Sequence, residues 1–269
     1  MGACGGACLV YGELLPGGCA RALRRLGLTG AGEDTCRGTL LELGMGTGKV
    51  ALQAFLQCPS LSRVIGVELS RPRFALAAEA LRRLAAARQG ELRLEEEPEA
   101  PPAQADDEAT CAVPSSHAIR RCLLTAPGGG AVPERTLELR RGDFLQEEFV
   151  GDAEFQGADA VLLQLCLPQD ALRRVQERLR LAPQGCRLFV LSDFRAKWRL
   201  PRPSHFYPWR RGDEPGQDEE ICEDHYATTW ASTYGMTFYT FRADWQRWEL
   251  CHGSGTHDSM RRIAGANQR

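Results

Sequence analysis

An apolar stretch that runs into three alternate glycines constrains the fold of this 269-residue chain most strongly. The stretch reads Leu-Leu-Glu-Leu over residues 40–43, and the glycines are Gly44, Gly46 and Gly48. Glycine lets the backbone turn sharply and approach a ligand, and the helical spacing of residues 50–57 points a helix N-terminus at the same place. The segment therefore predicts a strand, a tight turn and a helix, as in a nucleotide-type cofactor site.

The spacing of the glycines argues against two phosphate-binding motifs. A dinucleotide fingerprint needs G-x-G-x-x-G and a P-loop needs G-x-x-x-x-G-K-[ST], whereas this loop reads G-x-G-x-G and Val50 follows Lys49. The next predicted strand, 63–68, ends in Glu68, whose carboxylate can accept hydrogen bonds from ribose hydroxyls. A ribose site without a pyrophosphate site matches S-adenosylmethionine.

A third polar strand end supports the same cofactor. The apolar pattern of 137–142 is followed by Asp143 and Phe144, which suit the amino group and the ring face of adenine. Open α/β sheets bind their ligands at the carboxyl ends of the strands. We therefore expect Glu68 and Asp143 to lie at one edge of the sheet, beside the glycine loop.

The chain alternates between strand-like and helix-like segments, which predicts an α/β fold. This pattern favours a Rossmann-like, mostly parallel sheet that closes with an antiparallel hairpin. The predicted strands begin at residue 39 and cover 63–68, 159–166 and 185–192; the predicted helices cover 19–30, 50–57, 71–88 and 170–181; the hairpin covers 228–243.

We predict one catalytic domain with appendages, since 269 residues suit one or at most two domains. Residues 1–38 form an N-terminal helical and loop segment, 39–250 the main domain and 251–269 a flexible tail. Residues 90–135 are rich in Glu, Pro, Ala and Gly, which predicts a disordered insertion with a helical fragment at 119–124.

The composition limits the cell compartment and the classes of binding partner that we expect. The formal charge of -2 gives no overall basic field for nucleic acid. Eleven cysteines without a C-x-x-C pair indicate a reducing, intracellular compartment and no metal site. No apolar run reaches the roughly 18 residues of a membrane span, so we expect no membrane contact.

Arginines of residues 195–211 alternate with aromatic residues. Such interleaving can make a weak contact with nucleic acid or an acidic protein face. The equally weighted alternative is a covering loop whose aromatic side chains pack on the sheet and whose arginines are solvated.

Four motifs in order resemble a known enzyme family. They are Val10-Tyr11-Gly12-Glu13, Glu42-Leu43-Gly44-Met45-Gly46-Thr47-Gly48, Gly66-Val67-Glu68 and Arg141-Gly142-Asp143-Phe144-Leu145. Together they look like the motifs of the non-SET histone lysine methyltransferases, the disruptor-of-telomeric-silencing family. The resemblance covers roughly residues 9 to 243 without the insertion. It implies a class I methyltransferase fold, S-adenosylmethionine as cofactor, a histone or nucleosome as partner and a nuclear location, with the cytoplasm as the alternative.

The resemblance also implies roles for single residues. Tyr11 and Glu13 would cover the methionine end of the cofactor, Glu42 would stand near its amino group, and Lys49 would bring a positive charge toward it. The three loop glycines would form the floor, Glu68 would hold the ribose, and Asp143 with Phe144 the adenine. Trp230, Phe238 and Tyr239 would line an apolar channel for the target lysine, whose ammonium loses its proton more easily there.

One departure from the family pattern concerns the transferred methyl group. The family has an asparagine pair after its fourth strand, but this chain has a single asparagine, Asn267, in its tail. Gln164 or its neighbour takes that place and offers an amide on a longer arm. Two alternatives stay open: a methyltransferase for another protein or a small molecule, and a catalytically silent, cofactor-binding interaction protein.

Overall fold

The computed structural model of the chain describes residues 13–29, 38–98, 119–126, 128, 134–200, 204–209, 223–229, 231, 233 and 235–252. Among the predicted site residues, Tyr11 and Trp230 lie outside these ranges. The predicted tail also lies outside them, except that residues 251 and 252 belong to a helix.

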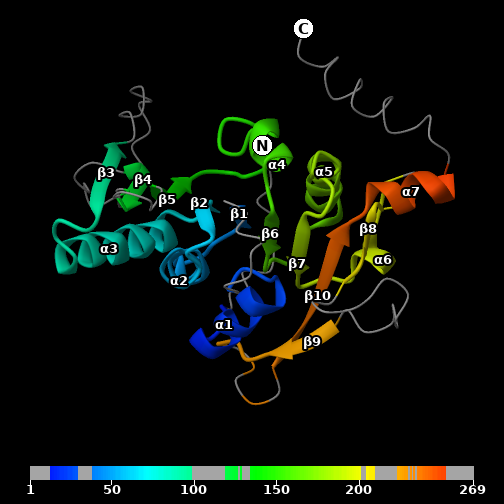
Figure 1. The fold of residues 1–269 in the computed structure, drawn as a ribbon, viewed down its shortest axis with the longest axis horizontal. Coiled ribbons are helices and arrows are strands. Elements are labelled where there is room, and N and C mark those ends of the chain that lie inside the picture. The colour runs from blue at the N-terminus through cyan, green and yellow to red at the C-terminus, as the bar shows by residue number, and fades with distance from the viewer. Residues whose placement is uncertain are drawn as a thin grey trace, which may run out of the picture.

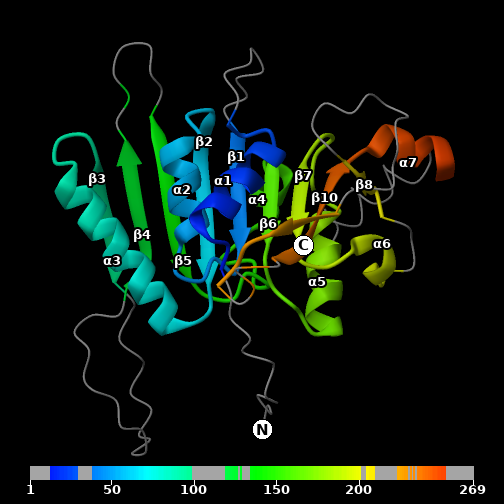
Figure 2. The same ribbon diagram turned by 90° about the horizontal axis from the view of Figure 1, so that it is seen from below.

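A single mixed sheet organises the described residues (Figures 1 and 2). Its centre consists of parallel strands, in the order β5 (Arg135–Arg141), β2 (Leu61–Glu68), β1 (Gly38–Leu43), β6 (Ala160–Leu163) and β7 (Arg187–Val190). Antiparallel strands extend both edges: β4 (Ile119–Ala126) and β3 (Arg93–Pro98) beyond β5, and β10 (Met236–Ala243), β8 (Phe206–Pro208) and β9 (Glu223–Tyr226) beyond β7.

Helices cover both faces of this sheet, as Figure 1 shows. On one face, α1 (Pro16–Arg25), α2 (Lys49–Gln57) and α3 (Arg71–Ala87) pack in one apolar cluster. On the other, α4 (Asp152–Gln156), α5 (Gln169–Leu179) and α6 (Phe194–Lys197) join a second cluster. Strands covered on both faces are apolar throughout, so a charged residue inside one of them indicates a function or an ion pair.

The predicted α/β fold is confirmed. The central strands and helices α2, α3 and α5 lie within a few residues of the predicted ranges. The closing hairpin is also present, but its first strand is Glu223–Tyr226 rather than a segment after residue 228. The last helix, α7 (Trp245–His252), follows β10, and no helix in the described ranges is long and apolar enough to cross a membrane.

The prediction of disorder and of a helical fragment between residues 90 and 135 is wrong where the structure describes that segment. Residues 93–98 and 119–126 form β3 and β4, which extend the sheet beside β5. The signal is the alternation within β4, because Cys122 and Leu124 are buried against α3 while Arg121, the residue before Cys122, is exposed. The acidic and proline-rich sequence around β4 obscures this short pattern.

Candidate cofactor site

The glycine loop lies between the end of β1 and the start of α2. Gly44, Gly46 and Gly48 have φ angles of 76°, 61° and 76°, in the left-handed region that favours glycine. A Cβ atom on Gly44 would lie 2.3 Å from Cδ1 of Leu165, which follows β6. Both the backbone conformation and the crowding therefore require glycine at this position.

Glu68 ends β2 and braces the loop. Its side chain is buried, and Oε2 accepts a hydrogen bond from the amide of Gly46 over 2.8 Å. Oε1 accepts one from the amide of Ser70 over 2.7 Å. Each carboxylate oxygen can accept a second hydrogen bond. The structure thus places Glu68 directly beside the loop, as the sequence predicted.

Glu42 is the penultimate residue of β1 and is completely buried. Burial raises the pKa of this carboxyl to about 8, and the nearby charges of Glu13 and Glu68 add to that effect. Gln164, just after β6, donates from Nε2 to Oε1 of Glu42 over 3.1 Å. Two buried acceptors, Glu42 Oε2 and Gln164 Oε1, have no hydrogen-bond partner. A donor group is needed here, since buried polar atoms are rarely left unpaired.

Glu13 reaches the loop from the N-terminal segment. Its buried carboxylate accepts hydrogen bonds from the amide of Thr47, over 2.9 Å, and from the Thr47 hydroxyl. Lys49 at the start of α2 lies 2.5 Å from Glu13 Oε2. Lys49 was predicted to bring charge toward the cofactor, and the structure pairs that charge with Glu13.

Asp143 and Phe144 follow β5 at the same edge of the sheet. Asp143 Oδ1 accepts a hydrogen bond from the amide of Leu145 over 2.9 Å, which fixes the turn. Phe144 is 7% exposed and packs in the second apolar cluster. The two residues occupy the strand end that was predicted for adenine.

Phe238 and Tyr239 do not line one channel, which corrects the prediction. They are successive residues of β10, so their side chains point to opposite faces of the sheet. Phe238 is buried and stacks on Phe189 with ring centroids 4.8 Å apart. Tyr239 packs against the cluster on the other face. Phe238 is therefore a core residue.

The predicted arginine-rich surface lies mostly outside the described residues. Within them, Trp198 and Phe206 pack against the second apolar cluster, as expected for a covering loop. No group of His, Cys, Asp and Glu side chains in the described ranges is arranged to hold a metal ion.

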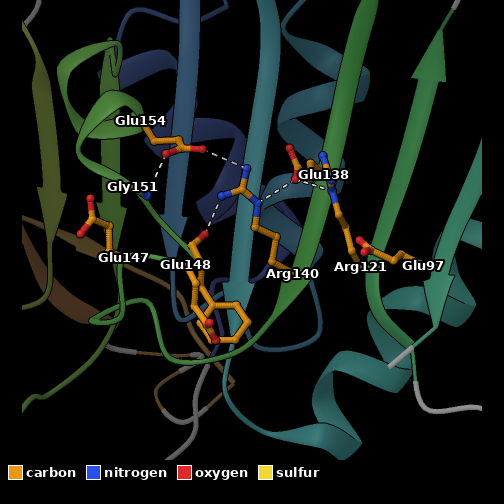
Figure 3. A pocket seen from close by; sticks show the side chains of 9 residues that line it. Glu97, Arg121, Glu138, Arg140, Glu147, Glu148, Gly151 and Glu154 are labelled. Atoms are coloured by element: carbon orange, nitrogen blue, oxygen red, sulfur yellow. Dashed lines mark hydrogen bonds and ion pairs between the residues drawn. The ribbon is translucent and has the colours of Figure 1, made fainter. Parts of the chain in front are cut away.

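A separate pocket of about 330 Å³ lies on the face of β5 opposite to α3 (Figure 3). Its lining residues are Glu97, Arg121, Glu138, Arg140, Glu147, Glu148, Phe149, Gly151 and Glu154. Buried Glu138 accepts hydrogen bonds from Arg140 over 2.7 Å and from Arg63 over 3.0 Å. Sequence patterns missed this network, although an acid between Leu137 and Leu139 in an apolar strand was a signal.

Comparison with known proteins finds distant structural likenesses and no family. The sequence matches no protein-family model and no curated protein. YhhF of Escherichia coli, described as a candidate methyltransferase, has 10% identity and a TM-score of 0.43, with 86% of this chain and 89% of that chain covered. TrmN of Thermus thermophilus has 15% identity and a TM-score of 0.44, with 84% of this chain and 48% of that chain covered.

A third structure, Trm1 of Pyrococcus horikoshii, is a complex with S-adenosylmethionine. It has 15% identity and a TM-score of 0.33, with 57% of this chain and 31% of that chain covered. At such identities the likeness concerns the fold alone. The strand order itself, with antiparallel β10 beside β7 at the edge of a parallel centre, is that of a mostly parallel α/β sheet closed by antiparallel strands. The predicted fold class is confirmed.

Proposed function

We propose that this chain binds S-adenosylmethionine at the carboxyl edge of its parallel strands and transfers the methyl group. The observation that carries the proposal is the pair of unpartnered acceptors, Glu42 Oε2 and Gln164 Oε1, buried beneath the glycine loop. The amino-acid part of the cofactor carries a primary ammonium, which can donate hydrogen bonds to these oxygens and whose positive charge favours the ionised form of Glu42.

The other strand ends suit the remaining parts of the cofactor. Glu68 accepts one hydrogen bond on each carboxylate oxygen, and Oε1 also lies 3.9 Å from Nη1 of Arg73, so Oε2 is the oxygen with room for a ribose hydroxyl. Asp143 keeps Oδ2 for the adenine amino group. The three glycines leave space for close backbone contact because they carry no side chain.

Methyl transfer makes modest demands on the protein. The sulfonium supplies an activated methyl group for in-line displacement by a neutral nucleophile. The residues of the chain would therefore hold the cofactor, align the acceptor and exclude water. In this scheme the cofactor is bound by Glu42, Gln164 and Glu68, and no general-base triad is needed.

As the acceptor we propose a lysine of a protein, with a core-histone lysine in nucleosomes as the specific candidate. This rests on the ordered motifs from Val10 to Leu145 that resemble the non-SET histone lysine methyltransferases. A nuclear location belongs to the same proposal. A methyltransferase for another protein or a small molecule is the alternative within this class.

One observation favours a second candidate, a protein that binds the cofactor without turnover. The Gln164 amide, expected near the transferred methyl, is instead committed to Glu42. It therefore stabilises the binding pocket and is less available to align an incoming amine.

Two measurements separate these candidates. Calorimetry should detect S-adenosylmethionine binding, and Glu68→Gln should weaken it while the exposed control Glu91→Gln leaves it unchanged. No heat at millimolar cofactor would reject the cofactor site.

Labelled cofactor incubated with nucleosomes should then label a core-histone lysine. Gly46→Arg should abolish labelling, whereas Gly90→Arg should not, because Gly90 also has a positive φ but open space around it. Labelling of small molecules alone would reject the histone proposal, and binding without any labelling would support the silent protein.

A further inference from the structure

Three segments far apart in the sequence meet at Glu13. Its carboxylate holds Thr47 of the glycine loop through the threonine amide and hydroxyl. Its own amide donates to Oγ1 of Thr229 over 3.1 Å, and its carbonyl accepts from the amide of Thr229 over 2.9 Å. The amide of Leu15 continues this pairing to the carbonyl of Ala227 over 3.0 Å.

These contacts give the side chain and the main chain of Glu13 different tasks. The side chain faces the cofactor loop, and the main chain pairs with Thr229, which directly precedes Trp230, a residue expected at the acceptor side. A displacement of Glu13 would therefore disturb both sides of the site together.

A cation lies beside the Glu13 carboxylate. The carboxylate is 7% exposed, and an unpaired charge at such depth is strongly unfavourable. Lys49 Nζ lies 2.5 Å from Oε2, while the Lys49 side chain is 54% exposed. Lys49 can therefore be replaced without opening a cavity. The N-terminus of α2, where Lys49 lies, also favours an anion, so loss of Lys49 should weaken the arrangement and not abolish it.

We propose that Lys49 is a positioning residue that fixes Glu13 on the glycine loop and thereby ties residues 227–229 to the cofactor site. The effect of Lys49 on cofactor affinity rests on the proposed function. The tie, meaning the connection from Lys49 through Glu13 to residues 227–229, does not. The sequence offers a matched control, because Lys49 and Lys197 are the two lysines of the chain. Lys197 is exposed and lies 3.5 Å from the Ser192 hydroxyl.

The tie can be measured without any cofactor by acetylating lysines and following each site by mass spectrometry. The ion pair occupies the Lys49 ammonium, so Glu13→Gln should raise the acetylation rate of Lys49 at least about threefold and leave Lys197 unchanged. Lys49→Gln should also speed amide hydrogen exchange at Thr47 and Thr229. Unchanged acetylation and exchange in folded variants would overturn the proposal.

Cofactor binding supplies the second readout. Lys49→Gln should raise the dissociation constant of S-adenosylmethionine about fivefold, and Lys49→Arg should restore it to within about twofold because the charge returns. Lys197→Gln should change nothing. Equal weakening by Lys49→Arg and Lys49→Gln would reject a charge-based role. If the wild-type protein binds no S-adenosylmethionine, the proposed function fails, while acetylation and exchange still decide whether the tie exists.

Discussion

Gln164 donates a hydrogen bond from Nε2 to Oε1 of Glu42 over 3.1 Å, which joins the end of β6 to the end of β1. The two residues are 122 positions apart in the sequence. The bond favours the ionised carboxylate, against the burial that favours the neutral acid. Gln164 therefore orients Glu42 and, together with a backbone hydrogen bond from Ala51, opposes the rise of its pKa, which still reaches about 8.

Replacing Gln164 by leucine should weaken cofactor binding. The variant removes one acceptor for the ammonium and the hydrogen bond that lowers the pKa of Glu42, so binding at pH 7 should fall about tenfold or more. Gln57→Leu, at the exposed C-terminus of α2, is the control. Calorimetry of both variants checks this, and equal affinities would contradict it.

Glu42→Gln should stabilise the protein without ligand at neutral pH while it weakens cofactor binding. The pKa of Glu42 is raised from 4.5 to about 8. Its contribution to the free energy of unfolding is therefore fully present below pH 4.5 and is lost as the pH rises toward 8. The variant escapes this loss, which is a few kcal/mol at most because each pKa unit corresponds to about 1.4 kcal/mol. Urea unfolding of the wild-type protein and the variant at pH 5 and pH 8 measures this loss. A difference in stability between the two proteins that does not change with pH would disprove the prediction.

Glu138→Gln should destabilise the sheet edge at neutral pH. Burial raises the pKa of Glu138, but Arg140, Arg63 and Arg121 outweigh it and lower the pKa to about 2. Its stabilisation is therefore present above pH 4.5 and is lost as the pH falls toward 2.

We expect a loss of about 3 kcal/mol at pH 7 for this variant, because it leaves charged arginines around a neutral group. Glu147→Gln, exposed in the same pocket, should have little effect (Figure 3). Urea titrations between pH 7 and pH 2 test both, and a difference that persists at pH 2 would argue against the ion network.

Gly44→Ala should cost more stability than Gly90→Ala. Both glycines have positive φ, 76° and 84°, so each alanine pays about 1 kcal/mol of backbone strain. A Cβ on Gly90 meets nothing within 4 Å, whereas one on Gly44 would overlap Leu165 and cost about 1–3 kcal/mol more. Thermal unfolding of the two variants measures the difference, and equal losses would show that Leu165 moves away freely.

Much of the fold could be predicted because local patterns match it. The apolar strands 40–43 and 63–68 and the helical spacing of α2, α3 and α5 placed the parallel centre correctly. The hairpin β3–β4 was missed because β4 shows its alternation over only a few residues. It is held by a tertiary ion pair, in which Arg121 lies 2.6 Å from buried Glu138.

Within the site, sequence determined which side chains stand at the strand ends. Glu42 and Glu68 lie in the last two residues of their apolar strands and Asp143 lies just beyond β5, and parallel strands bring their carboxyl ends to one edge. The sequence could not show how these side chains pair, because hydrogen bonds between residues from separate elements depend on exact distances. Examples are the ion pair between Glu13 and Lys49 and the hydrogen bond between Gln164 and Glu42.

The sequence by itself determined an α/β chain with a glycine loop and acidic strand ends, because these depend on local periodicity and backbone freedom. Tertiary structure alone decided that Phe238 is a core residue, that Lys49 pairs with Glu13 and that Glu42 Oε2 is buried without a hydrogen-bond partner. Burial and charge pairing arise only when distant segments meet, so they are set by the packed fold and not by any one segment.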